Sequence, residues 1–245
     1  MTLYTTDDFL GGRVVLKQPK EGYRATSDSV LLAAAVRAKA GETVLDVGTG
    51  TGVVALCLNA RCPNLTYTGL EYQSDLAELA RENARTNHCD LTVIETDISK
   101  RPSPIHGKQF HHVVTNPPFY TEAGFRSHPQ TAIAYKEQVP LSVWLDFCLR
   151  HLRAKGTFTM IHRAESLADI LSCLDGRLGA LEVLPIEPKA GCPSKRIIVR
   201  GIMNSRKPLS LCAGLVMHNN DDTRTGMAEK IMRNGQGIDD FLKTS

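Results

Sequence analysis

The stretch that decides the fold is "ETVLDVGTGTG", residues 42–52. Its first part is a compact apolar run with Asp46 at its end, which predicts a buried strand. Glycines follow at positions 48, 50 and 52, and the segment "VVALCLNA" (53–60) then has the composition of a helix. A strand that turns into a helix through closely spaced glycines is typical of nucleotide-binding α/β folds. Taken alone, the loop is also compatible with a plain tight turn or with a dinucleotide.

The rest of the chain alternates strand-like and helix-like segments. Strand patterns occur at residues 13–19, 65–71, 91–96, 110–115, 156–162, 181–188 and 195–203, with a further candidate at 209–217. Helix patterns occur at 26–36, 74–87, 141–152 and 165–174, with a short one near 226–233. This alternation predicts an α/β fold with a doubly wound, mostly parallel, seven-stranded sheet. The last strands are joined by a short loop, which indicates an antiparallel end. We expect an N-terminal extension over residues 1–40 and a main domain over 41–245.

Composition narrows the class of protein. Hydrophobic residues make up 42% of the chain and charged residues 22%, as in ordinary globular domains. No apolar run reaches the roughly 18 residues that a membrane span needs, so we expect a cytoplasmic protein without membrane contact. The seven cysteines are odd in number and form no C-x-x-C pair, which argues against disulfides and a zinc site, so we expect no metal. Residues 145–245 hold 15 Lys and Arg against 11 Asp and Glu, a surplus that favours a polyanionic partner.

Polar side chains stand at the ends of the predicted strands, where open α/β sheets bind their ligands. Glu71 ends the second strand of the main domain, a place typical of an acid that accepts both hydroxyls of a ribose. Tyr72 offers a face for an adenine, and Asp97 an acceptor for its amino group. Asp46 suits a cationic amino group and disfavours a pyrophosphate. Glu71 and Asp97 also have plain explanations as a helix-terminal charge and a loop acid. Together the set fits S-adenosylmethionine better than NAD.

The fourth strand runs into "TNPPFY", residues 115–120. With "LDVGTGTG" and "GLE", this motif resembles the class I S-adenosylmethionine-dependent methyltransferases that modify amino groups. The resemblance implies a Rossmann-like fold, S-adenosylmethionine as cofactor, contacts from Gly48, Gly50 and Gly52, and catalysis by Asn116, Pro117, Pro118 and Phe119. An exocyclic amine is a poor nucleophile because its lone pair is delocalised into the ring. The Asn116 side-chain oxygen and the Pro117 carbonyl would accept its N–H bonds, and Phe119 would stack on the base. We also count Asn116 among the cofactor contacts.

The resemblance extends over roughly residues 8–203. The segments "FLGGRVVLKQPKEGYRATSDSVLLAAAV" and "GCPSKRIIVRG" are similar to the tRNA adenine-N6 methyltransferases that act beside the anticodon of a valine tRNA. In such enzymes the "GYRATSDS" segment covers the cofactor. This implies that Arg24, Thr26 and Asp28 contact S-adenosylmethionine, although Asp28 is also a plausible helix cap. The family commonly has Tyr where this chain has Phe119, so a phenolic hydrogen bond is absent.

A tRNA partner would need positive charge near the active site. We expect Lys195 and Arg196 to provide it, together with Arg126 in the long segment after the catalytic motif, while Tyr120 joins Phe119 in contacting the base. Three alternatives stay open: a protein-glutamine N5-methyltransferase, an N-methyltransferase for another base such as guanine N2 in rRNA or adenine in DNA, and an RNA-binding module without catalysis. The sequence leaves monomer and weak dimer equally open.

Overall fold

The computed structural model describes residues 3–100, 104–118 and 139–239 of the chain. Three predicted site residues, Phe119, Tyr120 and Arg126, lie outside the described residues, so their roles stay predictions. In the described part of the chain, none of the helices is both long enough and apolar enough to cross a bilayer.

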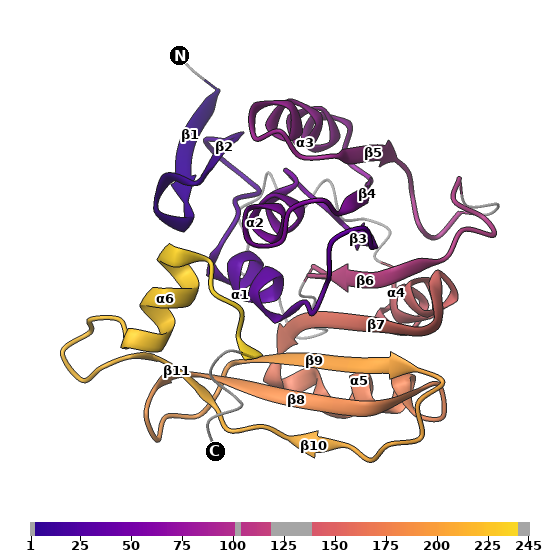
Figure 1. The fold of residues 1–245 in the computed structure, drawn as a ribbon, viewed down its shortest axis with the longest axis vertical. Helices are drawn as coiled ribbons and strands as arrows, with labels where there is room; N and C mark the ends of the chain where they lie inside the picture. Colours follow the sequence, from indigo (N-terminus) through magenta and orange to yellow (C-terminus); the bar gives the residue numbers. More distant parts are fainter. Residues whose placement is uncertain (1–2, 101–103, 119–138, 240–245) are drawn as a thin grey trace.

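The core of the fold is one twisted sheet whose strands run side by side in the order β5-β4-β3-β6-β7-β9-β8 (Figure 1). The strands are β3 (Thr43–Val47), β4 (Thr66–Glu71), β5 (Leu91–Glu95), β6 (Phe110–Thr115), β7 (Leu152–Arg163), β8 (Leu178–Lys189) and β9 (Arg196–Met203). All are parallel except β9, which runs antiparallel to both of its neighbours, β7 and β8. This arrangement confirms the predicted doubly wound sheet and its antiparallel end.

Two short strands extend the sheet beyond the seven that the sequence predicts. They are β10 (Ser210–Leu211) and β11 (Leu215–His218), and both pair in parallel with β8. The sequence indicated a single further strand at 209–217. In the structure the residues between Leu211 and Leu215 leave the sheet, so the segment pairs twice with β8.

Helices cover both faces of the sheet and meet it through separate apolar clusters. On one face lie α1 (Ser27–Ala35) and α2 (Val53–Arg61), and on the other α4 (Leu141–Arg150) and α5 (Leu167–Leu174). Strand β9 shows why both faces are apolar: Ile198 packs with the first pair of helices, while Ile197 and Val199 pack with the second. The helix α3 (Ser74–Thr86) packs over β5 through Ala77 and Ala80.

The N-terminal segment forms a hairpin of β1 (Tyr4–Phe9) and β2 (Val14–Pro19), joined by the short helix η1 (Leu10–Gly12). Two asparagines hold it, Asn83 on α3 and Asn87 directly after that helix. Asn83 bonds the backbone of Lys17, and Asn87 bonds that of Val15, each as donor and as acceptor. The helix α1 that follows is almost wholly buried in the core that it shares with α2. The division at residue 40 stays a prediction.

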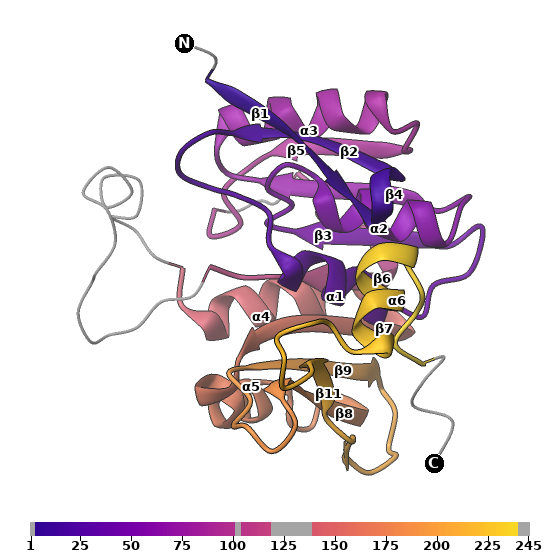
Figure 2. The same cartoon turned by 90° about the vertical axis from the view of Figure 1, so that its left-hand side faces the viewer.

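The C-terminal segment returns to the first helix of the chain. Helix α6 (Gly226–Asn234) packs against α1 and η1, in yellow beside the indigo elements in Figure 2. Beyond it, the Ile238 amide donates to the Ala34 carbonyl at 2.9 Å. Asp239 then forms ion pairs with Arg200 at 2.9 Å and with Arg37 at 2.6 Å, and Glu182 also pairs with both arginines. We call these four charged residues the C-terminal clamp.

Candidate active site

The glycine loop joins β3 to α2 with all three glycines in the left-handed region. Their φ angles are +76° for Gly48, +57° for Gly50 and +87° for Gly52, which side chains rarely adopt. Two aromatic rings also approach the loop closely. A Cβ on Gly50 would overlap the phenol of Tyr23, and one on Gly48 would lie 3.0 Å from the indole of Trp144. Glycine is therefore required here by the turn and by the rings packed on it.

Asp46 is an almost fully buried carboxyl at the end of β3, with 1% of its surface exposed. The Thr49 hydroxyl donates to its Oδ2 atom at 2.7 Å. Burial raises the pKa of Asp46 to about 7; the Thr49 hydrogen bond opposes this rise and the nearby Glu71 carboxylate adds to it. No ion pair to Asp46 or Glu71 occurs among the described residues, so the site gathers negative charge without a cation of its own.

Glu71 ends β4 and fixes the geometry of the two neighbouring turns. Its Oε2 atom accepts from the Gly50 amide at 2.8 Å, and its Oε1 atom accepts from the amides of Tyr72 and Gln73 at 2.9 Å each. Burial raises the pKa of Glu71 even though these three amides favour the charged form. Tyr72 stands beside it with 64% of its surface exposed, so its ring is open to a planar ligand.

Asp97 lies beyond β5 and is already engaged in a local turn. Its Oδ1 atom accepts from the Ser99 amide at 2.9 Å and from the Ser99 hydroxyl at 2.6 Å. The geometry is that of an Asx turn, in agreement with the plain explanation of this acid. Its second oxygen lies 3.9 Å from the Lys100 ammonium. Contact between Asp97 and an adenine stays a prediction.

The three residues expected from the "GYRATSDS" segment each bond within the protein. Arg24 holds the hairpin by donating to Thr5, to Asp7 and to the Pro19 carbonyl. Thr26 caps α1, because its hydroxyl accepts from the Asp28 amide at 3.3 Å. The Asp28 carboxylate accepts from Arg196 at 2.8 Å, so a predicted cofactor residue and a predicted substrate residue form an ion pair with each other.

Tyr23 is a further candidate for the site, and the sequence did not indicate it. It precedes Arg24, and its hydroxyl is the group closest to a Cβ placed on Gly50. The Gly50 amide donates to Glu71 at the end of β4. Tyr23 therefore lies beside the contact between the glycine loop and the end of β4. The only signal in the sequence was an aromatic residue inside a segment already expected to cover the cofactor.

The predicted catalytic motif follows β6 with Asn116 half-buried and Pro117 buried. The Asn116 Oδ1 atom is buried and accepts no hydrogen bond from any described residue. Just before it, Thr115 donates to the Val47 carbonyl at 2.8 Å and accepts from the Trp144 indole at 2.9 Å. These two bonds tie the motif to the glycine loop and to α4.

Strand register brings the separate motifs to one edge of the sheet. Val47 is paired with Thr115, and Val47 is also paired with Leu70, so Asp46, Glu71 and Asn116 stand at the ends of three adjacent strands. The antiparallel strand β9 begins at this same edge, where Arg196 is paired with Arg163 of β7. Lys195 precedes it and is exposed. In the described residues no cluster of His, Cys, Asp and Glu could hold a metal ion, and all seven cysteines are free thiols.

Comparison with known proteins indicates that the chain is a methyltransferase. A family model described as a methyltransferase small domain matches residues 24–142. A solved structure from Agrobacterium tumefaciens, described as a predicted O-methyltransferase, is 26% identical with a TM-score of 0.70, covering 86% of this chain and 97% of its own. A S-adenosylmethionine-dependent O-methyltransferase from Thermotoga maritima shares the fold, at 17% identity and a TM-score of 0.54 over 77% of this chain and 69% of its own.

Fold and site thus define a class I S-adenosylmethionine-dependent methyltransferase. A tRNA1(Val) (adenine(37)-N6)-methyltransferase from Porphyromonas gingivalis is 32% identical over 200 residues, which cover 75% of this chain and 78% of that protein. The chain belongs to this family. A release factor glutamine methyltransferase from Aliivibrio fischeri is 34% identical over 103 residues, a match that spans 39% of this chain and 36% of that enzyme.

The residues at the sheet edge fit the cofactor of this class. S-adenosylmethionine carries an ammonium group and a ribose but no phosphate, and the edge offers buried carboxylates with no competing cation among the described residues. The three glycines of the loop have left-handed backbones and no side chains, so a cofactor could approach the loop backbone closely. A dinucleotide would instead bring its pyrophosphate toward the buried Asp46 carboxyl, which is electrostatically unfavourable.

Proposed function

We propose that this chain methylates the exocyclic N6 amine of an adenine in tRNA, beside the anticodon, with S-adenosylmethionine as methyl donor. One observation carries the proposal: the buried Asn116 Oδ1 atom, which accepts no hydrogen bond from the described residues. A buried acceptor left unpaired costs about 1–3 kcal/mol, so a donor that a ligand brings to this atom would be favourable. An amine N–H of the substrate would satisfy it.

The motif can activate an amine without a strong base. The Asn116 Oδ1 atom would accept one N–H, and the Pro117 carbonyl would accept the other. Both acceptors pull the amine toward sp³ geometry, which localises the nitrogen lone pair. The Pro117–Pro118 pair restricts the backbone there, so the two acceptors are held in place before the substrate arrives. S-adenosylmethionine, when bound, supplies an electrophilic methyl group, and stacking of the base on Phe119 stays a prediction.

Other residues at the edge would hold the cofactor in position. Glu71 would accept the ribose hydroxyls with the lone pairs that its three amide donors leave over. The Asp46 carboxylate would attract the cofactor ammonium. Tyr72, exposed at the end of the same strand as Glu71, would cover one face of the adenine. Tyr23 would close the site from the side of Gly50.

The RNA would approach across the ends of β7 and β9. Arg163, Lys195 and Arg196 lie there, two strands or fewer from the catalytic motif. Adjacent strands are about 4.8 Å apart, so these cations stand within reach of phosphates flanking a base at Asn116. The target adenine would leave its stack to enter the site. RNA binding and a cytoplasmic location both stay predictions, testable by a binding assay and by cell fractionation.

The test is transfer of a tritiated methyl group to total tRNA from a strain that lacks this protein. We expect label in the RNA and N6-methyladenosine after digestion to nucleosides. The Asn116→Ala variant should transfer little label. Gln109→Ala, which removes an exposed amide directly before β6, at the opposite end of that strand from Asn116, is the matched control and should act like the parent protein. Normal transfer by Asn116→Ala would contradict the proposed mechanism.

A second candidate is methylation of a glutamine side chain in a protein. The match to the Aliivibrio fischeri glutamine methyltransferase favours it, and an amide nitrogen presents the same two N–H groups to Asn116. The same assay with a cell extract separates the candidates. Label in a release-factor-sized protein and none in tRNA would replace the tRNA proposal with this one.

A further inference from the structure

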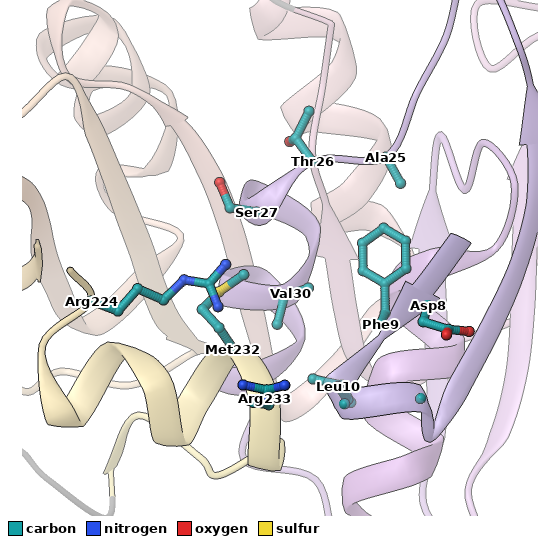
Figure 3. A pocket seen from close by; sticks show the side chains of 12 residues that line it. Asp8, Phe9, Leu10, Ala25, Thr26, Ser27, Val30, Arg224, Met232 and Arg233 are labelled. Carbon is teal, nitrogen blue, oxygen red and sulfur yellow. The ribbon is translucent and has the colours of Figure 1, made fainter. Parts of the chain in front are cut away.

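A groove beside α1 lies outside the cluster of Asp46, Glu71 and Asn116, none of which lines it. It has a volume of about 700 Å³ and lies between η1, the first turns of α1 and α6 (Figure 3). Its apolar side is formed by Phe9, Val30 and Met232. The walls come from both ends of the chain, which meet only in the folded protein.

Two arginines, one at each end of α6, line this groove. Arg224 lies just before the helix and Arg233 in its last turn, and Figure 3 shows both reaching toward the hollow. They share a single carboxylate, since Glu229 pairs with Arg224 at 3.2 Å and with Arg233 at 3.3 Å. The hydrogen bond from Arg224, with that from Arg233 and the charges of both, lowers the pKa of Glu229. The two arginines together thus carry one positive charge more than Glu229 offsets.

Two more cations belong to the elements that form the groove, although neither is in its lining. Arg13 follows η1 and donates to the Asn234 carbonyl at the end of α6, and Lys230 is exposed on the same helix. Asp8 is the one acidic side chain in the lining, and it is exposed. An aromatic ring beside arginines is the combination that recognises a nucleotide, because the ring stacks on a base while guanidinium groups bind phosphate.

The groove adjoins the edge of the sheet at which Asp46, Glu71 and Asn116 stand, which we call the active edge. Its lining includes Thr26 and Ser27 at the start of α1. The next residue, Asp28, pairs with Arg196 at the beginning of β9. A strand of RNA that crosses Arg196 would therefore meet the groove directly beyond it.

We propose that the groove between η1, α1 and α6 binds the backbone of the substrate RNA, at a distance from the methylated base. This inference rests on the proposed function and extends it. The arginines bind phosphates and the Phe9 ring packs on a sugar or a base. The groove thus adds affinity without touching the reacting amine.

The test compares two double variants in binding of an in vitro transcribed tRNA over a range of salt. Arg224→Ala with Arg233→Ala removes the groove cations. Arg206→Ala with Lys207→Ala is the matched control, because both residues are exposed beyond the end of β9 that points away from the active edge. Each lost phosphate contact should lower the slope of log affinity against log salt by about 0.7–0.9, so the groove variant should lose about 1.4–1.8.

Turnover separates the outcomes. The groove variant should show a raised KM for tRNA, an unchanged kcat and an unchanged affinity for S-adenosylmethionine. Equal salt slopes for the groove and control variants would overturn the groove assignment while leaving the proposed function intact. If the parent protein transferred no methyl group to any RNA, the proposed function itself would fail. Circular dichroism of both variants checks that they are folded.

Discussion

Two regions of this protein bury charged groups in opposite ways. In the C-terminal clamp, Arg200 is 6% exposed and faces carboxylates on two sides. The hydrogen bonds and charges of Arg37 and Arg200 outweigh burial and lower the pKa of Asp239 to about 2. At the active edge, burial instead raises the pKa of Asp46 to about 7 and also raises that of Glu71. The clamp pairs its charges with each other, whereas the two acids at the edge have no cationic partner among the described residues, which leaves them available to the proposed cofactor.

The difference separates residues that stabilise the fold from residues that serve binding. Removing one partner of a compensated buried pair destabilises the protein, because the other charge is then buried without a partner. An uncompensated group costs stability until a ligand pairs with it. Substitutions in the clamp should therefore change unfolding, and substitutions at the edge should change turnover or affinity.

The largest effect is expected from Arg200→Ala in the clamp. It leaves Glu182 and Asp239 with one arginine between them and empties a buried site. We expect a loss of about 3–5 kcal/mol in the free energy of unfolding, measured by urea denaturation. Arg206→Ala, an exposed change past the end of the same strand, is the control. A loss below about 1 kcal/mol would mean that the clamp does not hold the C-terminal segment.

At the active edge, Asn116→Ala should lower turnover and leave stability intact, the reverse of the result expected in the clamp. The side-chain oxygen binds the amine most strongly in the transition state, so we expect kcat to fall by about 10²–10³. Stability should stay the same or rise, because the substitution deletes a buried unpaired acceptor. Single-turnover kinetics and urea denaturation on the same sample make the comparison. A large loss of stability with normal turnover would place Asn116 with the structural residues.

Glu71→Ala tests whether an edge acid serves the cofactor. Charge-assisted hydrogen bonds contribute about 1.5–3 kcal/mol, so the affinity for S-adenosylmethionine should fall by about 10- to 150-fold in calorimetry. Glu71 also accepts three backbone amides, so this variant should lose some stability as well. Glu71→Gln keeps one acceptor oxygen and the shape, and should lose less affinity. Unchanged affinity in both variants would remove Glu71 from the cofactor site.

The pH dependence of cofactor binding should be the smallest of these effects. Because the pKa of Asp46 is about 7 in the empty protein, the carboxyl is largely neutral at pH 6 and ionised at pH 8. Only the ionised form attracts the cofactor ammonium, so affinity should rise with pH by up to about tenfold per unit until the group is ionised. Calorimetry from pH 5.5 to 8.5 measures the rise. Asp46→Asn should flatten the curve, and an equally steep curve in that variant would assign the titration to another group.

The sequence predicted the strand ends well because their signals are local. An apolar run followed by glycine, acid or proline places Asp46, Glu71 and Asn116 without knowledge of the rest of the chain. Strand β1 gave no such signal, since "YTTDDF" is polar and its alternate residues are exposed. The pairing of residues 209–217 with β8 in two pieces depends on tertiary contacts that no local pattern shows.

The sequence predicted the rest of the site less well, because the contacts of those residues involve partners that are distant in the sequence. Asp28 carries a carboxylate that suits a ligand, yet its partner in the structure is Arg196, 168 residues away. Tyr23 was not predicted, because nothing in the residues around it in the sequence shows that its ring lies on Gly50. The assignments of Arg24, Thr26 and Asp97 stay predictions, since each has structural bonds that do not require a cofactor.

The packing of Trp144 on Gly48 gives this protein a built-in optical probe. It is the only tryptophan in the chain, so the whole indole emission comes from this one place. Its ring lies against the glycine loop and its N–H donates to the Thr115 hydroxyl, directly before Asn116, the predicted catalytic asparagine. Indole fluorescence responds to the polarity and the hydrogen bonding around the ring. Cofactor entering the loop and substrate engaging the motif should therefore each alter the emission spectrum, and both events can be followed in unlabelled protein on the timescale of a stopped-flow experiment.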